Sequence, residues 1–189
     1  MKQICLALLP LLLLLQTKSS AQSADDMKKW MDYMTPSDMH KMIARSDGEW
    51  KEEIKMWMAP GTPPQQMESA CTNKMILGGR YQESIHTGMM NGMPFEGHGT
   101  LAYDNALKIF ISTWIDNFGT GVMTLEGTWD EKTNTVTLVG KSTDPFTGKE
   151  LPVKEVMKLV NDNTQYMEMY NTTVDGKEYK SMEMTLTRK

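Results

Sequence analysis

Cysteine is nearly absent from this chain, which has only Cys5 and Cys71 among 189 residues. Cys5 lies in an apolar stretch near the start, so Cys71 has no internal disulfide partner once that stretch is removed. The fold must then be held by its own hydrophobic core, which a chain of this size can build. A lone cysteine is most often a small buried hydrophobic residue, and a reactive or intermolecular thiol is the alternative.

Long apolar runs are also scarce. Residues 4–15 form such a run, interrupted by Pro10, preceded by Lys2 and followed by the small residues Ser19-Ser20-Ala21. About a dozen apolar residues are too few for a transmembrane helix, which needs about 20, but this pattern is typical of a secretory signal peptide. We therefore expect residues 1–21 to be a signal peptide, with no transmembrane segment after it and export to the periplasm or medium of a bacterium.

Basic charge is limited to 20 residues against 24 acidic ones, a formal net charge of −4. Removal of residues 1–21 takes away Lys2 and Lys18 and changes this charge from −4 to −6. No stretch interleaves basic with aromatic residues, as surfaces that bind nucleic acid do. We predict no nucleic-acid partner.

Recognisable catalytic motifs are missing. The sequence contains no Gly-x-Ser-x-Gly elbow, no His-Glu-x-x-His, no Cys-x-x-Cys and no phosphate-binding glycine loop. Its three histidines, His40, His86 and His98, are too dispersed to predict a metal triad. We predict no metal site and no cofactor, and the sequence leans against an enzyme without excluding one.

Short segments of alternating apolar and polar residues fill the chain from Gly48 to Arg188, and Gly, Asn, Asp and Pro separate them. This pattern is typical of β-strands joined by tight turns. Strands so joined are antiparallel, and a meander of them removes its exposed edges by closing on itself. The sequence predicts ten strands, at about 48–59, 66–77, 80–88, 94–104, 107–116, 120–129, 134–142, 150–160, 164–173 and 177–188. Residues 48–189 are thus expected to form one mainly β domain, a ten-stranded barrel wide enough for a pocket.

Residues 22–47 are expected to form a helical N-terminal segment of two short α-helices. Apolar residues between positions 27 and 34 recur at spacings of three and four. Thr35 is a candidate N-cap for the second helix, and Pro36 suits its first position.

The two ends of the β pattern carry an aromatic residue and a cation. Trp50 follows Gly48 in the first strand and Arg188 lies in the last, so closure of the barrel would bring both together. We expect the guanidinium to stack on the indole. A Gly-x-Trp segment in the first strand and an arginine in the last resemble the lipocalin and wider calycin barrels.

Three further motifs are more distinctive: Leu77-Gly78-Gly79-Arg80-Tyr81, the segment from Pro94 to Asn105, and Ser112-Thr113-Trp114-Ile115-Asp116. In order and spacing they resemble the bacterial family called domain of unknown function 1579, and the resemblance runs from about Gly48 to Arg188. It implies a lipocalin-like barrel in an often exported protein. It supplies no catalytic residues.

Gly97 and Gly99 lie on one face of a predicted strand, and Glu96 and His98 lie on the other. If the Glu96 face points inward, these side chains line a polar pocket; if the glycines face inward at a bend, Glu96 and His98 are solvated. The candidate ligand-binding residues are Arg80, Glu96, His98, Trp114 and Asp116.

Methionine is abundant, with 19 in the chain, and pairs such as Met167/Met169 and Met182/Met184 share strand faces. Thioethers are ligands for Cu(I), but flexible methionines also fill barrel interiors. The leading hypothesis is an exported barrel that binds a small hydrophobic or amphipathic ligand. The alternatives are an enzyme of unrecognised type using Glu96, His98 and Asp116, a periplasmic Cu(I) or haem binder, and a structural envelope protein.

Overall fold

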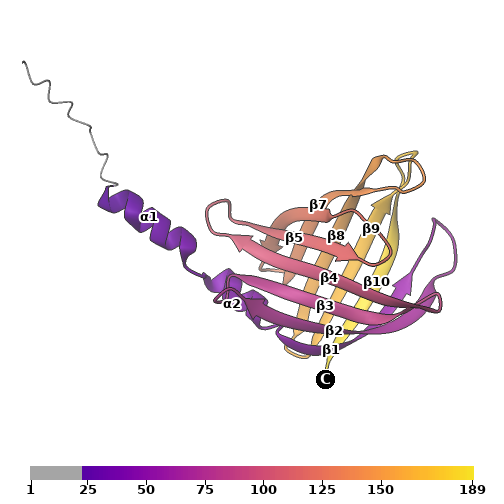
Figure 1. The fold of residues 1–189 in the computed structure, drawn as a ribbon, viewed down its shortest axis with the longest axis horizontal. Coiled ribbons are helices and arrows are strands. Elements are labelled where there is room, and N and C mark those ends of the chain that lie inside the picture. The colour runs from indigo at the N-terminus through magenta and orange to yellow at the C-terminus, as the bar shows by residue number, and fades with distance from the viewer. Residues whose placement is uncertain (1–22) are drawn as a thin grey trace, which may run out of the picture.

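The structure is a computed structural model that describes residues 23–189 (Figure 1). The expected signal peptide, residues 1–21, lies outside the described residues. A helical segment precedes ten strands. The strands are β1 (Gly48–Met56), β2 (Gln65–Ile76), β3 (Tyr81–Met90), β4 (Met93–Asp104), β5 (Ile109–Asp116), β6 (Met123–Asp130), β7 (Thr135–Thr143), β8 (Glu150–Asn161), β9 (Thr164–Thr172) and β10 (Glu178–Arg188).

The ten strands form one closed antiparallel barrel, which confirms the predicted meander. Nine of its pairings join strands that follow each other in sequence, and the pairing of β1 with β10 closes it. The turn chemistry explains the tight connections. Between β3 and β4, for example, Asn91 and Gly92 both have positive φ, 52° and 78°, as a two-residue hairpin requires.

The N-terminal segment is one bent helix in two pieces, α1 (Ala24–Met34) and α2 (Asp38–Ala44). The second piece begins at Asp38 and not at Pro36, because Ser37 is its N-cap and donates its backbone N–H to His40 Nδ1 at 3.0 Å. Thr35 instead ends α1. Neither helix in the described part of the chain is long and apolar enough to cross a membrane.

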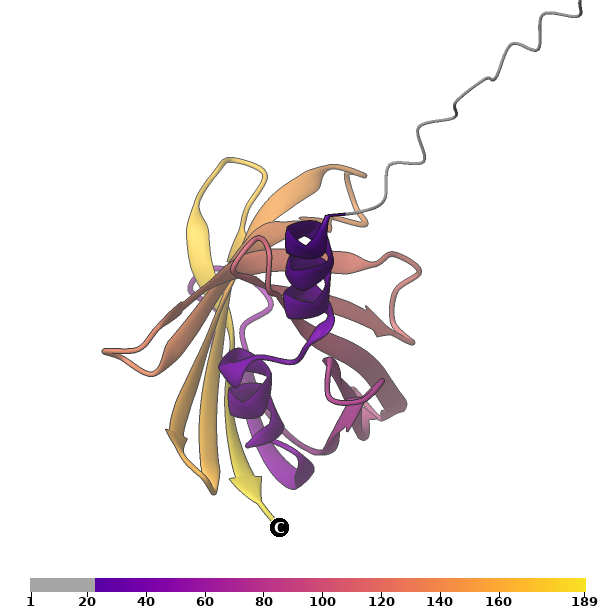
Figure 2. The same cartoon turned by 90° about the vertical axis from the view of Figure 1, so that its left-hand side faces the viewer.

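The two helical pieces differ in how they meet the barrel (Figures 1 and 2). α1 buries no residue and extends away from the strands, whereas α2 buries His40 and Ile43. Polar contacts fix α2 in place: Gln82 Nε2 donates to the Ile43 carbonyl oxygen at 3.1 Å, and Trp50 Nε1 donates to that of Ser46 at 2.8 Å. We call this the helix end of the barrel, and the opposite one the open end.

The helix end contains a compact apolar core. Ile43 from α2 packs there with five residues of four strands, β5 to β8, all at most 4% exposed. The core residues are Ile43, Phe110, Leu125, Val136, Leu138 and Val153.

Arg188 lies against Trp50 where β10 meets β1. Its guanidinium carbon is 4.3 Å from the centroid of the indole ring. The same group donates to backbone carbonyl oxygens of Arg45, Asp47 and Asp162. The last strand thereby fastens the first strand, the end of α2 and the β8–β9 turn together.

Candidate functional site

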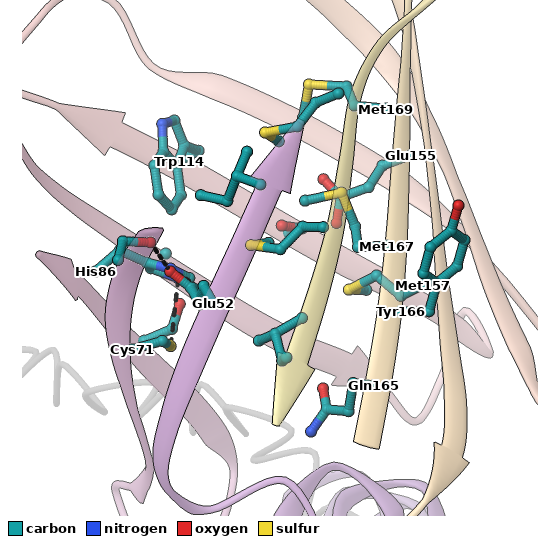
Figure 3. Close-up of a pocket in the computed structure, with 18 of the residues that line it drawn as sticks. Glu52, Cys71, His86, Trp114, Glu155, Met157, Gln165, Tyr166, Met167 and Met169 are labelled. Carbon is teal, nitrogen blue, oxygen red and sulfur yellow. Dashed lines mark hydrogen bonds and ion pairs between the residues drawn. The ribbon is translucent and has the colours of Figure 1, made fainter. Parts of the chain in front are cut away.

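The barrel interior contains a cavity of about 490 Å³ (Figure 3). It extends from Met42 and Ile43 of α2, at the helix end, to Met58 and Met89 at the open end. Met58 and Met89 are 61% and 55% exposed, so the cavity meets solvent at the open end. Its volume lies within the range of about 300–1,000 Å³ that is usual for small-molecule sites.

Methionine supplies much of the cavity wall, because the inward positions of β8, β9 and β10 repeatedly carry this residue. The lining methionines are Met42, Met56, Met58, Met67, Met89, Met90, Met123, Met157, Met167, Met169, Met182 and Met184. Their unbranched thioether chains adapt to apolar surfaces of different shapes. This wall suits an apolar group without selecting one shape.

Polar side chains lie between the methionines on the inward faces of β1, β2 and β3 (Figure 3). His86 Nδ1 lies 2.9 Å from Glu52 Oε1, and His86 Nε2 lies 3.6 Å from Cys71 Sγ. Ser69 Oγ donates to the other oxygen of Glu52. Glu52 is only 1% exposed, and burial together with the charge of Glu52 raises the pKa of the Cys71 thiol.

Trp114, on β5, packs against the imidazole ring of His86 inside the barrel. Its ring meets the imidazole edge to face, with centroids 5.0 Å apart, and its Nε1–H donates to Asp116 Oδ2 at 2.7 Å. Gly97 provides the space for the indole, because a Cβ there would lie 2.4 Å from Trp114 Cζ2. The glycine motif therefore shapes the interior around an aromatic ring.

Glu155 projects into the cavity from β8 and makes no hydrogen bond to any described residue. Its side chain is deeply buried, and desolvation raises its pKa to about 7, an effect that His86 partly offsets. On β9, the buried amide oxygen of Asn171 likewise has no partner in residues 23–189. Two polar groups along one wall thus remain available to a ligand.

The five candidate residues separate into two groups. Trp114 and Asp116 line the cavity, whereas Arg80, Glu96 and His98 do not. Arg80 is exposed in the β2–β3 turn, and its Nη1 donates to the Leu77 carbonyl oxygen at 3.0 Å. His98 Nε2 and Glu96 Oε1 form a surface pair at 2.9 Å. The inward position of Gly97 and Gly99 sends Glu96 and His98 outward, since neighbouring residues on a strand face opposite sides.

Sequence reasoning missed Glu52, His86 and Glu155 as site residues. A signal for two of them was present, because Glu52 stands between Trp50 and Ile54, and Glu155 between Val153 and Met157, at apolar inward positions. An acid at such a position breaks the expected alternation. His86 had no comparable signal, because its neighbours on the same face of the strand, Gln82, Ser84 and Gly88, are small or polar.

Comparison with known proteins gives a family and a fold. A family model described as "Protein of unknown function (DUF1579)" matches residues 35–188. The solved structure of Rv2717c from M. tuberculosis is similar at a TM-score of 0.62 and 12% identity, over 82% of this chain and 99% of that one. A redesigned β-barrel, b11L5F_LGL, matches at a TM-score of 0.41 and 15% identity, over 78% and 94%. None of the curated proteins compared matches.

Proposed function

The chain belongs to the protein family of unknown function DUF1579, and we propose that it is an exported binding protein whose barrel holds a small, partly apolar ligand. The observation that carries this proposal is the interior cavity of about 490 Å³, which is lined by many methionines and by a few buried polar groups. Sites of this kind bury most of a small ligand in apolar contacts and orient it by a few polar groups. The mode of binding is lipocalin-like.

The apolar part of the ligand packs against the methionines of β8, β9 and β10. Burial of apolar ligand surface contributes about 25 cal/mol per Å² before the costs of association are subtracted. Glu155 and the unpaired amide oxygen of Asn171 lie among these methionines in the described structure. A hydroxyl or amine on the ligand would satisfy them, because an unpaired buried acceptor is costly.

Entry is through the open end, where Met58, Met89 and Phe95 border the cavity. The helix end is filled by the apolar core around Phe110. A ligand therefore reaches the interior from one side.

The enzyme hypothesis that uses Glu96, His98 and Asp116 gains no support from this arrangement. Asp116 lines the cavity and accepts from Trp114, while Glu96 and His98 pair on the outer face of β4. Groups on the outer and inner faces of the barrel sheet cannot contact one substrate together.

Export is proposed from the sequence of residues 1–21, whose short apolar run and small residues match a cleaved signal peptide. Expression of the full chain in a bacterium tests it. We expect the protein in the periplasm or medium, with its first residue at Gln22. Full-length protein retained in the cytoplasm would refute export and would leave the binding proposal open.

Titration with the solvatochromic dye Nile red tests the binding proposal. We expect one dye per chain, with a blue-shifted emission, and Ser84→Phe should reduce the affinity because Ser84 lines the cavity. Thr87→Phe is the matched control, since Thr87 lies on the same strand with its side chain exposed. Equal binding by both variants, with normal circular dichroism, would place the dye outside the barrel and contradict the proposal.

A further inference from the structure

Glu52, Cys71 and His86 bring a carboxylate, a thiol and an imidazole together on three adjacent strands (Figure 3). One potential ligand atom from each lies within 4.8 Å of the other two. Glu52 and Cys71 are 1% and 2% exposed, so the cluster is buried at the cavity wall. Buried groups of this kind are costly unless they pair with one another or bind a metal.

The spacing of the sulfur and nitrogen atoms fits a shared metal ion. Zinc bonds of about 2.3 Å to sulfur and 2.0 Å to nitrogen at a tetrahedral angle put these atoms about 3.5 Å apart. Cys71 Sγ and His86 Nε2 are 3.6 Å apart. An oxygen of Glu52 lies within 4.8 Å of a ligand atom of each of the other two residues, and Glu52 would exchange its hydrogen bond with His86 Nδ1 for a bond to the metal as the third ligand, as in zinc sites that keep one position open.

The charges around the cluster favour a cation. The Cys71 thiol donates to Asn73 Oδ1 at 3.1 Å, and the Glu52 carboxylate lies in the same cluster. Two further carboxyl groups, on Asp116 and Glu155, face the same cavity. A divalent ion would supply the positive charge that this interior lacks and would stabilise a thiolate.

We propose that Glu52, Cys71 and His86 bind Zn²⁺, with the fourth coordination position facing the cavity. On binding, the S–H bond of Cys71 breaks, a zinc–sulfur bond forms and the proton passes to solvent. The donor set of one nitrogen, one sulfur and one oxygen suits Zn²⁺ better than Cu(I), which prefers sulfur ligands, and better than Mg²⁺, which prefers oxygen. This site is independent of whether the cavity also takes an apolar ligand.

The same three side chains are also in the order of a nucleophilic triad, with thiol, imidazole and carboxylate in sequence. The surroundings do not fit acyl transfer. The Asn73 amide lies against the thiol, but its N–H donates to the Ser46 carbonyl oxygen at 3.1 Å and so is not directed at a substrate oxygen. Metal binding uses the cluster without such a donor.

Titration of the purified protein with Co²⁺, which replaces Zn²⁺ and absorbs light, tests the site. We expect one Co²⁺ to bind per chain and to give a sulfur-to-cobalt charge-transfer band in the near ultraviolet. Addition of Zn²⁺ should displace the Co²⁺ and remove this band. Cys71→Ser should abolish the charge-transfer band. His86→Gln should weaken Co²⁺ binding by about tenfold or more.

His98→Gln is the matched control, because His98 also pairs with a glutamate but on the outer surface. It should bind Co²⁺ like the unmodified protein. Circular dichroism checks that each variant folds, and a second measurement needs no variant: Zn²⁺ should raise the Tm of the unmodified protein and Mg²⁺ should not. No charge-transfer band in the unmodified protein, or a band that survives Cys71→Ser, would overturn the proposal. Nile red binding in metal-free protein is measured separately, so either proposal can fail alone.

Discussion

The two ends of the barrel are built differently. At the helix end, α2 covers the strands, a buried core fills the interior, and Arg188 fastens three segments through their backbone carbonyl groups. At the open end, three of the five connections, 57–64, 91–92 and 117–122, carry no charged residue. Phe118 and Phe146 there are 44% and 95% exposed. Stability is thus concentrated at one end, which leaves the other free to admit a ligand.

The largest difference in stability between the two ends is expected from two phenylalanines, one near the start of β5 and one just after its end. Phe110 is fully buried at the helix end, and Phe118 lies just beyond the open end of β5. Phe110→Ala should lower the free energy of unfolding by about 3–5 kcal/mol, because it removes apolar burial and leaves a cavity. Urea denaturation measures this. Phe118→Ala should cost less than about 1 kcal/mol, and equal losses at both positions would contradict the comparison.

Glu155 is a buried residue of the cavity wall, and its effect on stability should depend on pH. In the unfolded chain its carboxyl has a pKa near 4.5, and in the folded protein near 7. Between these values the folded state binds more protons, so the free energy of unfolding falls as the pH rises through this window. Glu155→Gln should remove a penalty of about 3 kcal/mol at pH 8 and change little at pH 4. Urea denaturation at both pH values tests this, and a variant that is less stable than the original at pH 8 would contradict it.

Arg188 tests how far the helix end depends on one side chain. Arg188→Gln removes charged hydrogen bonds to backbone oxygens and the contact with Trp50, and it should cost about 2 kcal/mol. Arg188→Lys should recover little of this, since an ammonium cannot reach three divergent oxygens. Thermal denaturation measures the loss. Full recovery by lysine would show that charge alone is required.

A substitution of Phe146, at the open end, should have the smallest effect on the free energy of unfolding. It is 95% exposed in the β7–β8 connection. Phe146→Ser should change the free energy of unfolding by less than about 0.5 kcal/mol, because no burial is lost. A loss above about 1 kcal/mol in urea denaturation would mean that this connection packs against something in the folded protein.

The fold was predictable because its signals are local. Pairs such as Asn91-Gly92 and Asp175-Gly176 mark hairpins whose strands can pair only with their neighbours, and ten such strands leave closure as the way to remove the edges. The start of α2 was less predictable. Pro36 and Ser37 both suit a helix start, and the choice depended on the side chain of His40.

The candidate site was only partly predictable. The alternation of side chains along a strand shows that Glu96 and Gly97 face opposite sides, but it does not show which side is the interior. The packing of Trp114 over Gly97 inside the barrel places Gly97 on the inner side. The cluster of Glu52, Cys71 and His86 required the register of three strands, which places Cys71 opposite both Trp50 and His86. Register is a property of pairing and is not visible in any one segment.

The single pairing between β1 and β10 has a kinetic consequence. Hairpins between neighbouring strands form in about 1–10 μs, but β1 and β10 join Trp50 to Arg188 across nearly the whole domain. This contact cannot offset the entropy lost in bringing its two strands together until the intervening chain is ordered. Such non-local contacts slow folding. We therefore expect the contact between Trp50 and Arg188 to form in the last step of refolding, with Arg188→Gln mainly speeding unfolding because its interactions form after the transition state.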